Sequence, residues 1–438
     1  MCNQDYKIKM INVSGKIFIF LIILIWNNSF LLAQDANQVR ESQNLFREAK
    51  ISLQENDINS FKEKVKKALS LRPNHPTLLI NYSYALVMSG QLDYAVEILE
   101  ELADMGMYYE LSAIDEFKVL TQKKGYERVQ NKFQRNRQPV GSAKLEVKLS
   151  NKNLLLEGLA FSTSDSTYYF TSVHKQAVLK YNPVTEKYTS QELSISPLGI
   201  KFDSRRENIW VTISGLEEGE NTERKLLGQG GIGRINLDNG EFVLEFMLNN
   251  DSVDHVLGDL LIENDNSIYV TDSVEGLIYH FDRILDHIKP LTQKGSLISP
   301  QGIEIASNSD RLILADYSIG LLSVNKVDGK VVTISNETNT TLLGIDGIYR
   351  YRDSIIAIQN GTRPNRIIQL KLNHQETSVI DYKVLLANHK DLDDPTLGQI
   401  VGDKFLFNAN SQWVKFNPRL NSDSNERVEP KILSIDLN

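Results

Sequence analysis

A short phrase recurs six times after residue 150, and each copy places a glycine beside an apolar residue. An alternating stretch, a strongly apolar stretch and a turn follow each glycine. The first residues of the six steps are separated by 41, 60, 43, 45 and 51 residues. A repeat of roughly 40–50 residues that is made of strands is the signature of a β-propeller blade. The steps are Glu157-Gly158-Leu159, Leu198-Gly199-Ile200, Gly258-Asp259-Leu260, Gln301-Gly302-Ile303, Asp346-Gly347-Ile348 and Leu397-Gly398-Gln399.

The first residue of each step is expected to face a central channel. In chain order these residues are Glu157, Leu198, Gly258, Gln301, Asp346 and Leu397. If the function is chemical, we expect it in this ring.

Each glycine step is followed by a run of β-branched and aromatic residues that is typical of a strand buried on both faces. We expect six blades over residues 142–438, closed by pairing of residues 143–149 with residues 431–437. Closure leaves no free sheet edge. The predicted central strands are Tyr168–Thr171, Ile209–Thr212, Ile268–Thr271, Leu312–Ala315, Ile355–Ile358 and Phe405–Phe407.

The net charge of −8 argues against nucleic acid as a partner, because a phosphate backbone requires a clustered basic footprint. One basic stretch, residues 123–137, is interpreted as the solvated face of a helix.

Residues 1–34 are interpreted as a bacterial-type signal peptide. Three lysines precede the apolar run Ile17–Trp26, which is too short for a comfortable membrane span, and Leu31-Leu32-Ala33 is an acceptable cleavage site. An uncleaved anchor is the alternative. The single cysteine, Cys2, lies inside this segment, so thiolate chemistry is excluded for the mature chain. We expect an exported protein of the periplasm or cell exterior.

Residues 36–138 have helical periodicity, and residues 73–105 resemble a tetratricopeptide repeat. Small residues would let the two helices approach closely, and Gly90 would let the chain reverse. One reading is a groove that binds a peptide or partner protein, and the other is a packing module or spacer docked on the propeller. The matching residues are Tyr82, Ser83, Ala85, Leu86, Gly90, Leu92, Ala95 and Leu99. The overall fold class is thus a multidomain α and all-β chain, a short helical array followed by a six-bladed propeller.

The second blade carries a glycine-rich, acidic insertion, Gly215–Gly231, that we interpret as a mobile lid. Its end, Gly228–Gly233, matches the dinucleotide fingerprint by letter. The match is rejected because the following residues predict a strand and not the helix N-terminus that would hold a pyrophosphate.

The propeller segment resembles the SMP-30/gluconolactonase family over about residues 150–420 through Glu157–Phe161, Tyr269–Ser273, Ser299–Ile303 and Ile345–Ile348. That resemblance implies a channel Ca²⁺ held by a Glu, two Asn and an Asp, which correspond here to Glu157, Gly258, Gln301 and Asp346. Gln301 keeps a carbonyl oxygen on a longer stem, whereas Gly258 offers no side chain, so Asp259 is the substitute ligand. The alternative is that Glu157 and Asp346 are channel residues bonded to backbone amides.

With a metal, the resemblance implies hydrolysis of a lactone or ester, in which the ion polarises the carbonyl and Asp346 or Glu157 orients or deprotonates a water. His255 is expected at the channel mouth, either as a general base or as a loop histidine bonded to a nearby carbonyl. Asp272 and Asp316 are interpreted as turn-forming carboxylates.

Two hypotheses follow. The first is an exported, calcium-dependent hydrolase that acts on a lactone or ester. The second is a non-catalytic scaffold whose propeller binds a small molecule or peptide and whose residues 36–138 hold a protein partner. The sequence leaves open the substrate, the partner and the oligomeric state.

Overall fold

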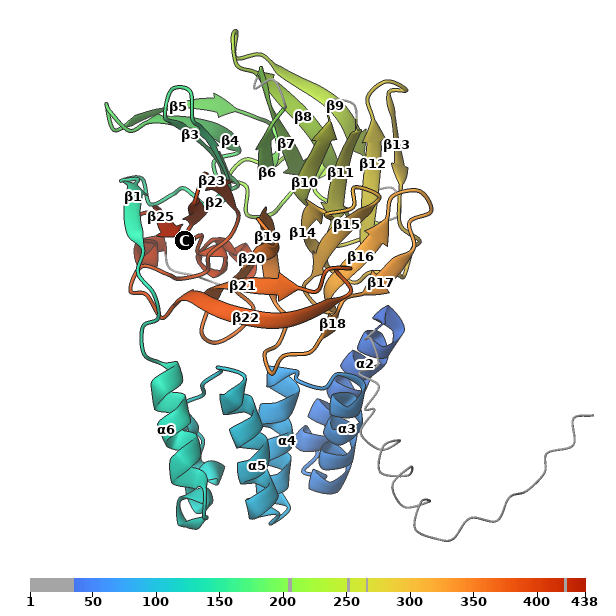
Figure 1. Ribbon diagram of the computed structural model, residues 1–438, viewed down its shortest axis with the longest axis vertical. Coiled ribbons are helices and arrows are strands. Elements are labelled where there is room, and N and C mark those ends of the chain that lie inside the picture. The colour runs from blue at the N-terminus through green and yellow to red at the C-terminus, as the bar shows by residue number, and fades with distance from the viewer. Residues whose placement is uncertain (1–34, 204–206, 250–252, 265–266, 421–423) are drawn as a thin grey trace, which may run out of the picture. The chain divides into compact units, whose positions relative to one another are not determined.

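The structure is a computed structural model that describes residues 35–203, 207–249, 253–264, 267–420 and 424–438. The segment 1–34, for which a signal peptide is expected, lies outside the described residues. In the described residues, five α-helices are followed by six sheets, each with four antiparallel strands, and the fifth sheet also holds a short parallel strand (Figure 1). The first strands of the six sheets neighbour one another in a closed cycle, which is the architecture of a six-bladed propeller.

Each of the first five blades is a meander of four strands that runs outward from the channel. Blade 1 holds β2 (Leu156–Ser162), β3 (Thr167–Ser172), β4 (Ala177–Asn182) and β5 (Lys187–Glu192). Blade 2 holds β6 (Ser196–Phe202), β7 (Asn208–Ser214), β8 (Gly230–Asn236) and β9 (Phe242–Leu248). Blade 3 holds β10 (Leu257–Asn264), β11 (Ser267–Asp272), β12 (Leu277–Asp282) and β13 (His287–Pro290). Blade 4 holds β14 (Pro300–Ile305), β15 (Arg311–Asp316), β16 (Gly320–Asn325) and β17 (Val331–Thr333). Blade 5 holds β19 (Ile345–Tyr351), β20 (Ser354–Gln359), β21 (Arg366–Leu372) and β22 (Ser378–Ala387), with β18 (Ser335–Asn336) parallel to β22.

The sixth blade joins strands from two distant parts of the chain. It comprises β23 (Gly398–Val401), β24 (Lys404–Asn408), β25 (Lys431–Asp436) and, outermost, β1 (Lys144–Lys148). Lys144 pairs with Ser434 and Lys148 with Lys431. The predicted closure of the ring is thereby confirmed.

All six predicted central strands are confirmed as the second strands of their blades, and their side chains are buried on both faces. Threonines in these strands also tie neighbouring blades together. The Thr171 hydroxyl accepts a hydrogen bond from Gly158 N at 2.6 Å and donates one to Leu198 O at 2.5 Å. Thr212 repeats the arrangement one blade further on, with Gly199 N and Gly258 O. These bridges fix the innermost strands against one another.

The sequence Gly228–Gly233 enters strand β8 and not a helix, which confirms the reason for rejecting a dinucleotide site. The insertion before it is held in place by several contacts. Glu217 pairs with Arg419 at 2.7 Å, and Lys175 pairs with Glu220 at 2.6 Å. His174 Nδ1 lies 2.6 Å from Glu218 O. The structure therefore shows the predicted lid as a segment tied to blade 1 and to the C-terminal region.

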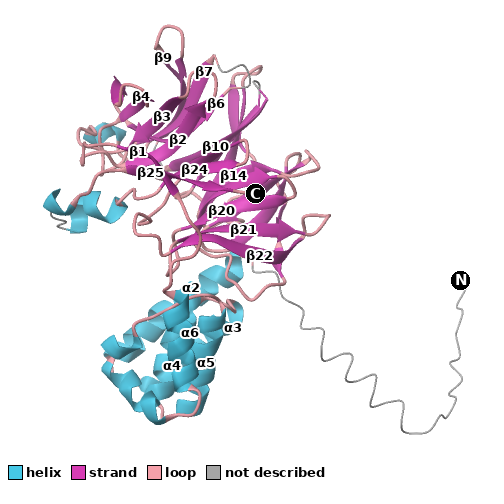
Figure 2. Cartoon of the chain, turned by 60° about the vertical axis from the view of Figure 1, so that its left-hand side comes forward, coloured by secondary structure: helices cyan, strands magenta, loops and turns pink. Residues whose placement is uncertain are grey.

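The helical part contains α2 (Ala36–Gln54), α3 (Ile58–Leu71), α4 (Pro76–Met88), α5 (Leu92–Asp104) and α6 (Tyr126–Asn136), shown in cyan in Figure 2. A capping box between Asp35 and Gln38 begins α2. The helices α4 and α5 reverse at Gly90, whose φ of 74° is left-handed as expected. The buried Ser83 hydroxyl donates to Ala95 O at 3.2 Å, so small residues do bring these two helices together. The relation to tetratricopeptide repeats stays a prediction.

The helical periodicity expected over residues 36–138 holds only in part. Residues 111–122 form the 3₁₀ segments η1 (Leu111–Ala113) and η2 (Asp115–Gln122), and only α6 is an α-helix. The apolar residues Leu111, Ile114, Phe117 and Leu120 recur every three residues, which is the period of a 3₁₀-helix and not of an α-helix.

The helices contact the propeller directly. Arg40 donates to Gly295 O and Leu297 O at 2.8 and 2.9 Å, and Ala36 and Val39 of α2 join the buried cluster of blades 3 and 4. Asn388 Nδ2 donates to Asn136 O at 2.8 Å. Within the described residues, no helix is both long and apolar enough to cross a membrane.

Candidate functional site: the helix-covered end of the channel

Five of the six glycine steps lie at irregularities in the innermost strands. In each of the first five blades the pairing shifts at the step, so that two residues of the first strand lie opposite one residue of the second. Such β-bulges redirect side chains. Gly158 is required because an added Cβ would lie 2.4 Å from Leu198 O of the next blade. The bulges thus let the innermost strands approach while the preceding residue is presented to the channel.

Glu157 is a buried carboxylate at this ring. Its Oε2 accepts a hydrogen bond from Trp413 Nε1 at 2.8 Å, and its backbone carbonyl accepts from Asn408 Nδ2 at 2.6 Å. Burial raises the pKa of Glu157 well above its usual value, and the negative charge of Asp346 raises it further. The Glu157 side chain is therefore held by a hydrogen bond, but no neighbouring positive charge compensates its ionised form among the causes that set its pKa.

Asp346 lies close enough to Glu157 for the two charges to interact. Its Oδ2 accepts a hydrogen bond from Asn360 Nδ2 at 3.0 Å. Asp346 keeps some accessible surface, yet desolvation by the surrounding protein, followed by the charges of Asp394 and Asp259, raises its pKa from 3.8 to about 7. The hydrogen bond from Asn360 acts in the opposite direction.

Gln301 and Gly258 form a complementary pair. In the register of the strands, Gly258 takes the place that Glu157, Gln301 and Asp346 take in their blades. An added Cβ at Gly258 would meet Gln301 Oε1 at 3.5 Å, an ordinary contact. Gln301 Nε2 donates to Ser299 Oγ at 3.1 Å. The longer stem of Gln301 therefore brings its carbonyl oxygen toward the space left by the missing side chain.

Asp259, the substitute ligand expected from the sequence, is buried and lies nearer to a lysine. Its Oδ1 accepts from Leu260 N at 2.9 Å and lies 3.8 Å from Lys201 Nζ. Its Oδ2 is buried and has no hydrogen-bond partner. Burial raises the pKa of Asp259, whereas Lys201 lowers it. Lys201 also lies 5.2 Å from the ring centre of Tyr349.

Lys201 marks the opposite end of the channel. There a cavity of about 380 Å³ is lined by residues from five innermost strands, among them Leu159, Lys201, Ile303 and Gln399. One end of the channel thus holds a lysine, and the other end holds the acids Glu157 and Asp346.

His255 lies between blades 2 and 3 and is buried. Its Nδ1 is 2.6 Å from Asp272 Oδ2 and 3.6 Å from Glu275 Oε2, and its backbone N donates to Gly228 O at 2.8 Å. The hydrogen-bond partner of the His255 ring is thus a carboxylate and not the carbonyl that the sequence analysis expected. Asp272 Oδ1 accepts from the backbone N–H groups of Val256, Val274 and Glu275, so Asp272 is also the turn former that the sequence predicted.

Among the described residues, His255, Asp272 and Glu275 form the one group of three acidic or histidine ligand atoms that all lie within 4.8 Å of one another. Their hydrogen bonds account for this proximity, since Tyr279 also donates to Glu275 Oε2 at 2.5 Å. Glu157, Asp346 and the neighbouring acids do not reach this mutual spacing.

Sequence reasoning missed several residues that shape the site. Asp394 has the geometry of a turn residue, with φ 59° and a hydrogen bond accepted from Trp413 N at 3.0 Å. Its charge nevertheless raises the pKa values of Asp346 and Glu157. Tyr317 donates to Asn360 Oδ1 at 3.0 Å. An Asn directly after the second strand of the Asp346 blade was the only available sequence signal.

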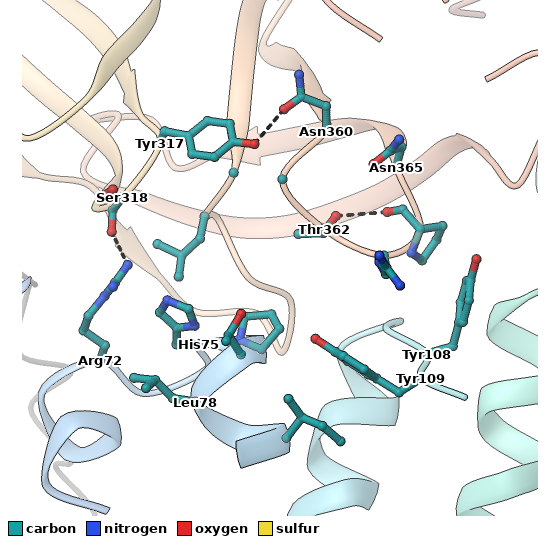
Figure 3. Close-up of a pocket in the computed structure, with 18 of the residues that line it drawn as sticks. Arg72, His75, Leu78, Tyr108, Tyr109, Tyr317, Ser318, Asn360, Thr362 and Asn365 are labelled. Carbon is teal, nitrogen blue, oxygen red and sulfur yellow. Dashed lines mark hydrogen bonds between the residues drawn. The ribbon is translucent and has the colours of Figure 1, made fainter. Parts of the chain in front are cut away.

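The acidic end of the channel adjoins a cavity of about 1100 Å³, which lies between the helices and the propeller (Figure 3). The propeller lines it with Tyr317, Ser318 and Asn360, and the helical part lines it with Arg72, His75 and Tyr109, among others. Asn360 lines the cavity and donates to Asp346, so one residue connects the cavity wall with the channel carboxylates. Figure 3 shows the two walls facing each other across the pocket.

The sequence matches no protein-family model and no curated protein. Solved six-bladed propellers are similar in backbone. A luciferin-regenerating enzyme is 12% identical, with a TM-score of 0.49 over 68% of this chain and 95% of that one. A calcium-binding protein, regucalcin, from Agrobacterium tumefaciens is 12% identical, with a TM-score of 0.48 over 66% and 93%. A gluconolactonase from Xanthomonas campestris is 13% identical, with a TM-score of 0.46 over 68% and 91%. At these identities and scores the likeness concerns the fold and carries no argument about chemistry.

Proposed function

We propose that the protein hydrolyses a lactone or another ester at the helix-covered end of its channel, with the aid of a calcium ion. The observation that carries the proposal is the group of mutually repelling acids, Glu157, Asp346 and Asp394, beside a large cavity. Strongly perturbed carboxyl groups that adjoin a cavity are candidates for a functional site. The resemblance of the propeller segment to the SMP-30/gluconolactonase family supports the same assignment.

The residues present suit a hard cation in their chemistry. Glu157, Gln301 and Asp346 offer carboxylate and amide oxygens, the donors that calcium prefers, and Asp259 has a buried oxygen without a partner. Each of the carboxylates Glu157 and Asp346 accepts a single side-chain hydrogen bond among the described residues. The wide spacing of the acids and the missing side chain at Gly258 favour weak binding in which waters complete the coordination. When bound, the ion would polarise the carbonyl of the substrate and stabilise the negative oxygen that develops.

The remaining chemistry belongs to Asp346 and its neighbours. Asp346 would take a proton from the attacking water, and Asn360 holds one of its oxygens in place. Water adds to the ester carbonyl carbon, the bond to the alkoxide breaks, and the proton held by Asp346 passes to that alkoxide. The products are an acid and an alcohol, or one hydroxy acid from a lactone. His255 takes no part in this proposal because its ring is engaged by Asp272.

The test is hydrolysis of a panel of lactones and aryl esters by the full chain, with calcium and with EDTA, together with thermal unfolding in both conditions. We expect calcium to raise the unfolding midpoint by mass action and to support turnover. Turnover that survives in both Glu157→Ala and Asp346→Ala would overturn the proposal.

The second candidate is a non-catalytic scaffold in which the propeller binds a small molecule or peptide and residues 36–138 hold a protein partner. The missing ligand at Gly258 favours it. We also keep export to the periplasm or cell exterior as a proposal, since it rests on residues 1–34. N-terminal sequencing of the protein from fractionated cells tests both export and cleavage after Ala33.

A further inference from the structure

Two arginines are buried where the helices meet the propeller, and they are satisfied very differently. Arg366, 1% exposed, donates to Gln359 Oε1 at 2.6 Å, to Thr340 Oγ1 at 2.7 Å and to Met105 O at 3.3 Å. Among the described residues, Arg72, 5% exposed, donates only from Nη2, to Ser318 O at 2.5 Å, and its buried Nε has no partner there. All three guanidinium nitrogens of Arg366 donate hydrogen bonds where the helices meet the propeller, whereas Arg72 has a donor group without an acceptor.

The charge of Arg72 also lacks a direct partner. Burial lowers its pKa only to about 10, so the guanidinium stays charged near neutrality. Within the described residues, no carboxylate oxygen lies within 4.0 Å of it. Asp316 acts on it from further away, and its two oxygens are occupied by the backbone N–H groups of residues 298, 299, 318 and 319. A buried charge without a close counter-charge is costly unless a ligand supplies one.

A second unsatisfied group lies three residues away. His75 Nδ1 is buried and has no hydrogen-bond partner. Burial and the charge of Arg72 lower the pKa of His75 to about 3, so the ring is neutral at physiological pH. His75 is also the N-cap of α4, where it makes no side-chain cap hydrogen bond. The positive end of the dipole of a 13-residue helix therefore points to the same place.

These groups line one cavity. Arg72, His75 and the first turn of α4 form its helical wall, and Tyr317 and Asn360 form part of the propeller wall (Figure 3). Arg363 on the exposed rim adds a further cation. The helical wall of the cavity thus holds the charged Arg72, the propeller wall holds the acid Asp393, and Asn360 connects that wall to Asp346.

We propose that this cavity is a binding site for a small molecule with a carboxylate or phosphate group, which Arg72, His75 and the N-terminus of α4 recognise. Resting on the function proposed above, the substrate is an anionic lactone or ester whose reacting group faces Asn360 and Asp346. An anion in the cavity would compensate the buried charge of Arg72, which no described carboxylate does at close range. The helical part then serves as the specificity wall of the propeller.

The test is isothermal titration of the full chain with glutarate, with dimethyl glutarate as its uncharged counterpart and with inorganic phosphate, each at millimolar concentration. We expect binding of glutarate or phosphate but not of the diester, and the comparison of the two anions distinguishes the carboxylate from the phosphate source. Arg72→Met should weaken binding of the anion at least tenfold, and Arg72→Lys should restore part of it. Arg224→Met, a control at an exposed arginine of the insertion Gly215–Gly231, which does not line the cavity, should bind as the wild type does.

Equal binding by the wild type and Arg72→Met, or no binding of either anion to folded wild-type protein, would overturn the proposal. Circular dichroism and the unfolding midpoint establish that each variant is folded. Asp346→Asn separates the two proposals, because it should abolish ester hydrolysis while it retains the anion. Anion binding in a protein without hydrolase activity would therefore refute the proposed reaction and leave the binding site standing.

Discussion

Two acidic groups in this propeller differ in how fully their oxygens are used. The ligand atoms of Asp272, Glu275 and His255 lie within 4.8 Å of one another, as they would around a metal ion. Backbone amides, the imidazole and Tyr279, however, already bond to the carboxylate oxygens. Glu157 and Asp346 belong to no such close group of three among the described residues, accept few hydrogen bonds and have raised pKa values. The short distances at Asp272 and Glu275 therefore reflect a structural hydrogen-bond network. The candidate site at Glu157 and Asp346 is indicated instead by carboxylates that lack a compensating positive charge.

The largest expected effect separates the two groups by activity. Asp346→Asn should lower kcat/KM for ester hydrolysis by ~10²–10⁴-fold, the usual contribution of a general base. Asp328→Asn, an exposed control in a hairpin of blade 4, should leave it unchanged. Steady-state kinetics at saturating calcium measure both. Comparable losses in Asp272→Asn and Asp346→Asn, per folded molecule, would remove the distinction.

The second effect concerns stability and has the opposite ranking. Asp272→Ala removes the acceptor of three backbone N–H groups and the partner of His255, and it should cost about 3 kcal/mol or more of unfolding free energy. Asp346→Asn should leave stability unchanged or increase it when EDTA is present, because it removes a repelled charge. Urea unfolding measures both. A large loss of stability in Asp346→Asn would instead make Asp346 a structural residue.

The third effect is a pH dependence of stability. The pKa of Asp346 is raised from 3.8 to about 7 in the folded state, so the folded protein binds more protons than the unfolded chain between these values. Stability should therefore fall as the pH rises from about 4 to about 7, and Glu157 contributes in the same direction. Unfolding midpoints across this range in EDTA measure the slope. Asp346→Asn and added calcium should each flatten it, and an unchanged slope in that variant would contradict the assignment.

The smallest effect sharpens the metal hypothesis. Gly258→Asn adds an amide oxygen at the ring position that lacks a side chain, where an added Cβ would make only ordinary contacts. Calcium affinity should rise by about one order of magnitude or less, since one neutral ligand is added to a weak oxygen site. Calcium titration calorimetry measures the change, with Gly402→Asn in an open turn as the control. A calcium affinity unaffected by Gly258→Asn would place any bound ion elsewhere.

The sequence determined the propeller because its information is periodic and local. Glycine steps at blade-like intervals and runs of β-branched residues located the blades, their central strands and the closing pair β1 and β25. The same pattern placed Glu157, Gln301 and Asp346 at equivalent ring positions, since each strand repeats the register of the last. It failed for residues 115–122, where a period of three was read as an α-helix.

Only the tertiary structure decided what surrounds the ring. Asp394 and Trp413 act on Glu157 and Asp346 from segments that are distant in the sequence, so no local pattern predicts these interactions. The same holds for Arg72, which resembles any helix-terminal arginine until the propeller buries it beside Ser318. The sequence determines which residues can carry charge. Desolvation of a charge and the lack of a partner for it arise only when distant segments pack together, and these two effects distinguish the candidate site.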